Sequence, residues 1–278
     1  MTVISTQIVD VDDIVTGHLW SVDDFDGLAK LIAIIAIGQA EHASEIINEL
    51  SVSLPVPSRL NFYDQAREQL KIRGKSKKEK EVSGYHRDGF LFECMSWIVA
   101  RQTAGENTYL KDPHISATTQ GLDGLIIQID PEEKIVTSTT ISEDKCTEYP
   151  RDKFRDGVMQ TFIEHHQNIR GPDLLANAAL LIKQSGLKGT AAILAAEKVY
   201  DISYRTYRAA LTVGKDFYAV DKRKKLFKGY DGLTDIQQDQ RVGAIFIVPG
   251  DLRVWFQELA DHVIEALNEF EQKEATNV

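Results

Sequence analysis

The sequence predicts an α/β fold, with a core of strands and helices and with helical extensions at both ends. Two consecutive apolar segments, 121–130 and 134–147, have the length and composition of neighbouring strands. An amphipathic helical pattern covers 150–169. A short segment that is apolar on both faces, 241–251, precedes a long helical pattern over 252–273. Strands and helices therefore follow one another in mixed order, which is typical of α/β proteins.

The first 84 residues are expected to be mainly helical. The segment 21–50 reads as one long helix, and the aspartates at its start suit the positive end of a helix dipole. Two prolines in 54–59 cannot continue a helix and should break it. A short helix is expected over 61–73, followed by a basic, glycine-containing loop over 74–84 that marks a candidate boundary.

The middle of the chain supplies the expected core. The segment 88–102 is an apolar helix with almost no polar face, and such helices are usually buried. A turn at Pro131 and Glu132 joins the two strands that follow. Two or three further helices are expected to fill 172–213.

The length of 278 residues predicts one large domain or one domain with extensions. We expect an N-terminal helical extension over 1–80, a core over 81–170, and a helical region over 171–278. The last region would add one core strand over 241–249 and the closing helix. The three parts together are expected to form one compact domain.

Composition limits the kind of protein. The two cysteines, Cys94 and Cys146, argue against a disulfide framework and are too few for a four-cysteine zinc site. The start of the chain lacks a signal-peptide pattern, and the longest apolar stretch, 31–37, is far too short for a membrane span. We therefore expect a cytoplasmic protein with no membrane partner.

The net charge of −10 argues against tight nucleic-acid binding through the overall field of the protein. Two basic segments, 71–81 and 221–229, stand out against it. They are either solvated loops or places of phosphate contact. On the second interpretation the candidate DNA contacts are Lys75, Lys77, Lys78, Lys222, Arg223, Lys224 and Lys225, together with Lys153 and Arg155 on the 150–169 helix.

The strand 134–147 ends in charged residues. Side chains on a strand alternate between its two faces, so Glu143 and Lys145 share the face of Ile141, and Asp144 points to the other face. An acid and a base at the edge of a core face have perturbed ionisation, which is common in active sites. The pattern indicates a candidate site at the end of this strand.

Two further carboxylates accompany this pair. Asp123 begins the preceding strand, between Gly121 and Gly124, where a carboxylate is unfavourable unless it is paired or bound to metal. Glu93 lies on the apolar helix 88–102, with Trp97 on the same face. A buried glutamate requires a cation.

These residues suit hydrolysis of phosphodiesters with a divalent metal. Carboxylate oxygens of Asp123, Glu143 and Glu93 are hard ligands that suit Mg²⁺ or Mn²⁺. Such a metal polarises the phosphate and lowers the pKa of the attacking water. Lys145 would orient or deprotonate that water, or stabilise the developing negative charge.

Each residue also has a structural interpretation. Glu143 and Lys145 would be a surface ion pair of little energetic value. Asp123 would be a turn residue beside glycine, and Glu93 would pair with Arg101 or a neighbouring basic side chain. A non-catalytic subunit that docks or regulates a nucleic-acid motor is the alternative function, and it would show the charged residues scattered or paired with arginines.

Gly121-Leu122-Asp123-Gly124-Leu125, followed one strand later by Glu143-Asp144-Lys145, resembles the PD-(D/E)xK nuclease superfamily. Glu93 fits the acidic helix position of its first motif. More narrowly, the chain is similar to the HamA-type nuclease subunits of the Hachiman anti-phage defence system and to the related nuclease subunits of the Abp system. The resemblance covers 84–170, about a third of the chain, and one departure is Leu122 where the family motif has proline.

The resemblance implies a restriction-endonuclease-like core, with a mixed sheet flanked by helices. It implies a Mg²⁺- or Mn²⁺-dependent deoxyribonuclease with Glu93, Asp123, Glu143 and Lys145 as its catalytic residues and the three carboxylates as its metal ligands. It also implies a HamB-like helicase partner that holds the nuclease inactive until phage or damaged DNA is sensed.

Overall fold

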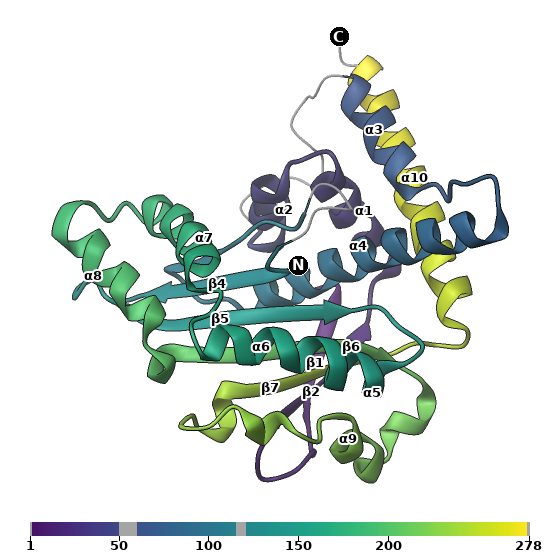
Figure 1. Cartoon of the computed structure of the whole chain (residues 1–278). Helices are drawn as coiled ribbons and strands as arrows, with labels where there is room; N and C mark the ends of the chain where they lie inside the picture. Colours follow the sequence, from purple (N-terminus) through teal and green to yellow (C-terminus); the bar gives the residue numbers. More distant parts are fainter. Residues whose placement is uncertain (1, 50–59, 115–120, 277–278) are drawn as a thin grey trace.

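The computed structural model of the chain describes residues 2–49, 60–114 and 121–276. Within them the strands form one mixed seven-stranded sheet in the order β1-β2-β7-β6-β5-β4-β3, with helices on both faces (Figure 1). The predicted α/β class is confirmed. The proline-containing break predicted over 54–59 lies outside the described residues.

The sheet has a parallel centre and antiparallel edges. Strands β2, β7, β6 and β5 run parallel to one another. Strand β1 pairs antiparallel with β2 at one edge, and β4 and β3 continue antiparallel from β5 at the other. The strands are β1 Ile4–Val9, β2 Thr16–Val22, β3 Thr108–Leu110, β4 Gly124–Ile129, β5 Val136–Lys145, β6 Arg205–Val213 and β7 Arg241–Ile247.

The helices gather on the two faces of this sheet. They are α1 Phe25–Ala36, α2 Ala40–Ile47, α3 Leu60–Leu70, α4 Lys77–Thr103, α5 Pro150–Lys153, α6 Met159–His166, α7 Gly171–Gln184, α8 Gly189–Tyr200, α9 Val220–Leu226 and α10 Leu252–Thr276. A π-helical turn, Phe154–Val158, joins α5 to α6, so the helix predicted over 150–169 is nearly continuous.

Each face of the sheet has its own apolar core. On one face α1, α4 and α10 bury a cluster that includes Trp20, Phe92 and Phe256, with the last two rings in edge-to-face contact. On the other face α6 to α9 bury a second cluster around Phe162 and Tyr230, whose rings stack. The strands between these clusters are covered on both sides, as expected for parallel strands.

The N-terminal prediction is wrong in two places. Residues 4–9 and 16–22 are strands of the sheet, so the 1–80 interval is not a purely helical extension. The helix expected over 21–50 is divided into α1, which Asp24 caps by accepting a hydrogen bond from the Gly27 N–H, and α2. Between them Gly38 has a φ of 80°, which a helix interior cannot contain.

Two other predictions fail. The loop expected over 74–84 ends at Ser76, because Ser76 and Glu79 form a capping box that starts α4 at Lys77. Strand β6 lies inside the region predicted to be helical over 172–213, and it occupies the sheet between β5 and β7. The strands expected over 121–130, 134–147 and 241–251, and the helices expected over 61–73 and 252–273, are confirmed.

None of the helices in the described ranges has the length and apolar composition that crossing a membrane requires.

Candidate functional site

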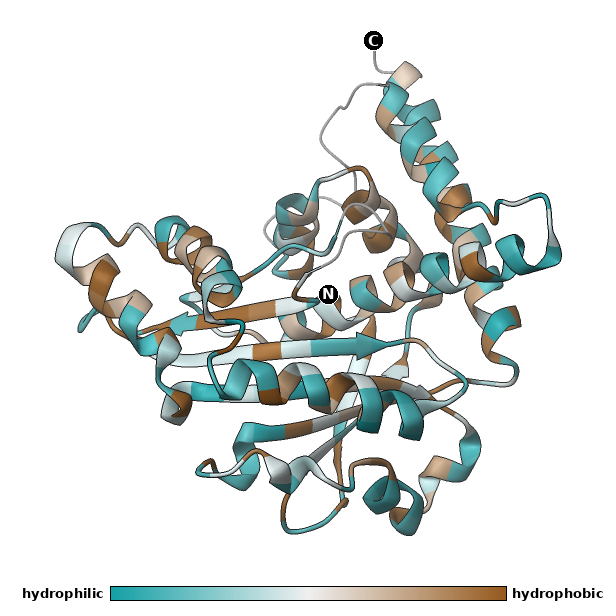
Figure 2. Cartoon of the chain, viewed as in Figure 1, coloured by the Kyte–Doolittle hydropathy of each residue, from teal (hydrophilic) through white to brown (hydrophobic). Residues whose placement is uncertain are grey.

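The candidate site lies where β4 begins and β5 ends. These strands run antiparallel with Gly124 opposite Ser142, so Asp123, just before β4, lies beside Glu143. Gly124 allows this close approach, since a Cβ there would lie 3.1 Å from the Ser142 Cβ. Figure 2 shows that β5 becomes hydrophilic toward its carboxyl end. The short connection between the two strands therefore brings residues 20 positions apart to one place.

Lys145 joins the two carboxylates. Its Nζ lies 2.7 Å from Asp123 Oδ2 and 2.8 Å from Glu143 Oε2. Asp123 Oδ2 also accepts a hydrogen bond of 3.0 Å from the backbone N–H of Asp144. The three residues predicted from the strand pattern are thus in direct contact.

The site is buried enough to perturb its charges. Glu143 and Lys145 pair in register with Ala209 and Leu211 of β6, on the face of the second apolar core. Burial raises the pKa of Glu143 to about 7, although Lys145 opposes the rise. Burial lowers the pKa of Lys145, but the two carboxylates outweigh it, and the net pKa lies above its ordinary value. Lys145 is therefore protonated, and it suits the stabilisation of negative charge better than general-base catalysis.

The opposite face of β5 carries a second polar group that sequence reasoning left out. Asp144 faces α4, where its carboxylate accepts a 2.8 Å hydrogen bond from Ser96 Oγ. Arg208 in turn donates to that hydroxyl at 2.6 Å. Burial raises the pKa of Asp144 to about 7, with Arg208 opposing. The strand alternation had placed Asp144 on this face, and the apolar helix 88–102 was the signal that this face is covered.

Glu93 belongs to this second group. Its Oε1 lies 2.9 Å from Nδ1 of His114 and accepts a 2.8 Å hydrogen bond from the His114 backbone N–H. It does not pair with Arg101, which donates to the Thr108 carbonyl. Sequence reasoning missed His114, which lies before the strand and carries no motif.

Asp123 lies between the two groups, since its Oδ2 contacts both Lys145 and the Asp144 backbone N–H. Glu93, Asp123 and Asp144 line a cavity of about 20 Å³, large enough for one water molecule. Trp97 lines it too, as the helical spacing from Glu93 predicts. No ion pair or hydrogen bond among the described residues joins Glu93 to Glu143 or Lys145, so the four predicted catalytic residues do not form a single contact cluster.

At the β5 end, only two of the three predicted metal ligands, Asp123 and Glu143, lie close together. In the ranges that the structure describes, no group of three or more histidine, cysteine, aspartate or glutamate side chains is arranged to hold a metal ion. Asp123 and Glu143 supply hard oxygen donors. Burial raises the pKa of Glu143, so a cation bound beside it would favour its charged form.

Most of the basic segment 221–229 lies in α9, and some of its charged groups form contacts inside the protein. Arg223 is buried, and its guanidinium donates to the carbonyls of Asp10 and Tyr218 at 2.8 and 2.7 Å. This overturns its prediction as a phosphate contact, because those donors are engaged. Lys222 and Lys225 lie 3.9 and 4.0 Å from Asp216 and Asp221, and Lys224 is exposed.

On the α5–α6 helix, Arg155 is exposed and pairs with Asp152 and Asp156 at 3.1 and 2.6 Å. Lys153 is also exposed, but no ion pair is found for it in the part of the chain that the structure describes. Lys153 is therefore freer than Arg155 to contact phosphate.

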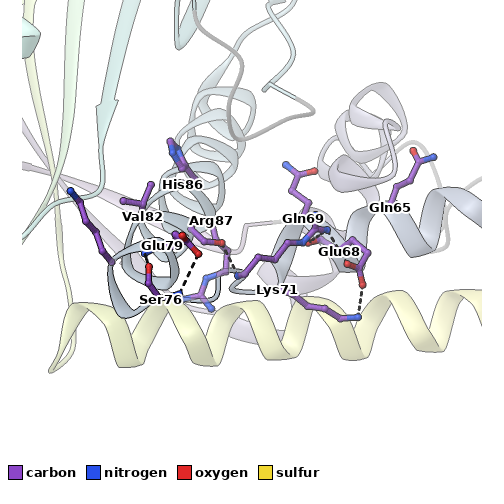
Figure 3. Close-up of a pocket in the computed structure, with 12 residues that line it drawn as sticks. Gln65, Glu68, Gln69, Lys71, Ser76, Glu79, Val82, His86 and Arg87 are labelled. Atoms are coloured by element: carbon purple, nitrogen blue, oxygen red, sulfur yellow. Dashed lines mark hydrogen bonds and ion pairs between the residues drawn. The ribbon is translucent and has the colours of Figure 1, made fainter.

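The other basic segment borders a cavity of about 690 Å³ between α3 and the start of α4 (Figure 3). Lys71 and Arg73 both pair with Glu68, at 2.7 and 2.9 Å. Glu79 accepts hydrogen bonds from the backbone N–H groups of Lys75 and Ser76. The lysines of this segment that remain exposed without a carboxylate partner in the described ranges are Lys75, Lys77, Lys78 and Lys80.

No family model, curated protein or solved structure matches this chain.

Proposed function

We propose that this protein is a metal-dependent DNA endonuclease that acts as the effector of an anti-phage defence system. The observation that supports the proposal is the contact of Asp123, Glu143 and Lys145 at the tips of two adjacent antiparallel strands. The spacing Asp, then Glu-x-Lys, is the one on which the resemblance to PD-(D/E)xK nucleases rests.

Asp123 and Glu143 are the residues that would hold Mg²⁺ or Mn²⁺. The ion would polarise a phosphodiester and lower the pKa of an attacking water. The Asp144 backbone N–H fixes the orientation of the Asp123 carboxylate. Glu93 fits a positioning role, since it is held by His114 and reaches Asp123 only across the small cavity.

Lys145 has two tasks in this proposal. Without substrate it neutralises the two carboxylates, at 2.7 and 2.8 Å. With DNA bound, its ammonium would donate to a phosphate oxygen as negative charge develops there. The net charge of −10 suits a nuclease with weak affinity for DNA by itself. A helicase partner would deliver the DNA, for which the acidic surface has little affinity. It would also restrain the enzyme until phage or damaged DNA is sensed.

Plasmid cleavage in Mg²⁺ tests the proposal. Wild type, Lys145→Met and Glu143→Gln are compared with Lys183→Met, a control on the exposed surface of α7. Each is assayed with and without the helicase and ATP. Cleavage by wild type and the control, with a loss of at least a hundredfold in the two site variants, is the expected result. Equal cleavage by all four proteins would refute the assignment.

Metal binding is measured separately from cleavage. A ligand present at 100 times its Kd stabilises the folded state by about 2.7 kcal/mol. Mg²⁺ should therefore raise the unfolding free energy of wild type, and Asp123→Asn should abolish this increase. No increase for wild type at 10 mM Mg²⁺ would contradict the proposed ligands.

A non-catalytic subunit that docks or regulates a helicase is the second candidate. It is favoured by the completeness of the ion pairs, because Lys145 already contacts both carboxylates. This function predicts no cleavage under any condition, no stabilisation by Mg²⁺, and unchanged helicase binding by Lys145→Met.

A further inference from the structure

A groove of about 790 Å³ runs between the first half of α4 and α10. Its floor is polar but already neutralised. Arg87 and Arg253 both contact the buried Asp88, at 2.7 and 2.6 Å, and Arg253 also lies 3.3 Å from Glu148. Because these charges satisfy one another, the floor does not require a charged ligand.

Part of the groove wall is apolar and open to solvent, beside the charged side chains Lys80 and Glu81 of α4. Ile72, Tyr85 and Val254 line it, and they are 42%, 42% and 65% exposed. Arg253 lies over the Tyr85 ring, 4.4 Å from its centroid, and holds that ring at the groove. Gly84 of α4, which has no side chain, also lines the groove. Exposed apolar side chains gathered in one groove are typical of an interaction site.

The rim on α10 is acidic. Glu258, Asp261 and Glu265 are exposed and follow one another at the three- and four-residue spacing that places them on one side of the helix. The stripe covers about 10 Å of the helix axis. In the described ranges none of the three pairs with a lysine or arginine, and Asp261 accepts only from the amide of Gln257. Like charges at this spacing destabilise a helix, so the stripe gains from an external cation.

We infer that the α4–α10 groove is the docking site for a basic, amphipathic helix of a partner protein. Apolar side chains of that helix would pack on Ile72, Tyr85 and Val254, and its lysines or arginines would pair with the acidic stripe. Both the shape and the charge correspond to the binding of a helix in a groove. The inference does not depend on nuclease activity, since its test measures binding alone.

The groove also lies near the candidate site. Glu148, which lines it, follows Lys145 by three residues on the same segment. A basic helix bound there would neutralise the acidic stripe of α10 and lower the repulsion that an approaching phosphate backbone meets at that face.

The test uses three fluorescent 18-residue peptides and the full chain at 100 mM salt. The first has leucines at helical spacing with lysines elsewhere, the second has glutamates in place of the lysines, and the third is a scrambled form of the first. Fluorescence anisotropy should show binding of the first peptide at least tenfold tighter than binding of either of the others. Equal affinity for the scrambled peptide would overturn the inference, because it would show attraction by net charge alone.

Two matched variants locate the site. Glu258→Lys, Asp261→Lys and Glu265→Lys together should weaken binding at least tenfold. Glu132→Lys, Glu133→Lys and Glu197→Lys make the same change in net charge at exposed positions elsewhere, and should change binding less than twofold. Equal weakening by both sets would overturn the assignment. If the first set unfolds the protein, Val254→Gln replaces it and should weaken binding at least fivefold; unchanged affinity would refute the groove.

Discussion

Replacing Lys145 by methionine removes the ammonium group that contacts both Asp123 and Glu143. The Glu143 side chain is 6% exposed and that of Lys145 is 31% exposed, so water replaces the lost cation poorly at Glu143. At an effective dielectric constant of about 20, unit charges about 4 Å apart attract by about 4 kcal/mol. Removing one partner of a buried pair costs about 3–5 kcal/mol, and the partial exposure of Lys145 reduces this to about 2–4 kcal/mol of unfolding free energy.

The same reasoning predicts a partial rescue. Burial raises the pKa of Glu143 to about 7, so at pH 8 its charge is unfavourable without Lys145. Glu143→Gln by itself should change the unfolding free energy by less than about 1 kcal/mol, because Lys145 keeps its contact with Asp123. The variant that carries both Lys145→Met and Glu143→Gln should be more stable, by about 1–3 kcal/mol, than the sum of the two single effects predicts.

Urea denaturation at pH 8 with EDTA measures all four proteins of this cycle. The reasoning is refuted if the two effects add within about 0.5 kcal/mol. Such additivity would show that Lys145 and Glu143 do not interact in solution, and it would remove the contact on which the candidate site depends.

Three further predictions concern stability. Burial and neighbouring arginines lower the pKa of His165 to about 4, so from pH 6.5 down to 4 the unfolded chain binds a proton that the folded chain does not. This removes up to about 3 kcal/mol of stability as pH falls, and His165→Phe should flatten that slope in denaturation at pH 7 and pH 4.5. Gly243→Ala should lower the midpoint of thermal unfolding and cost about 1–3 kcal/mol, because its Cβ would lie 2.6 Å from the Phe227 ring; an unchanged midpoint would contradict the packing. Gly89→Ala, inside α4 with no atom within 4 Å of the new Cβ, should instead stabilise by about 0.5–1 kcal/mol in urea denaturation, and a loss would show that this space is not free.

The fold could be predicted where the pattern is local. Strand β4 alternates in burial and is joined to β5 by a short turn, so the existence and antiparallel pairing of the two strands follow from neighbouring residues. The central strand β6, Arg205–Val213, lies in the region predicted to be helical, where the consecutive apolar residues Ala209, Ala210 and Leu211 give no strand period. It is covered on both sides by the two cores, which removes the alternation that marks a strand.

The candidate site was predictable to the same extent. Strand alternation is enough to place Glu143 beside Lys145, and the turn brings Asp123 to them. Strand alternation does not show which helix covers which face of the sheet, so it cannot predict that Glu93 lies apart from Glu143. The pairing of Glu93 with His114 depends on where the chain passes after β3, which has no sequence signature.

The parallel pairing of β2 with β7 places residues 16–20 against residues 242–246. A ribosome that adds about 5–20 residues per second needs roughly 10–45 s to pass from one strand to the other. Throughout that time β2 lacks its parallel neighbour, and the hairpin that it forms with β1 is of marginal stability by itself. The buried side of this hairpin, with Ile4 and Trp20, is then exposed to other nascent chains. Ribosome-associated chaperones that bind apolar segments would therefore be expected to bind residues 4–22 during this interval.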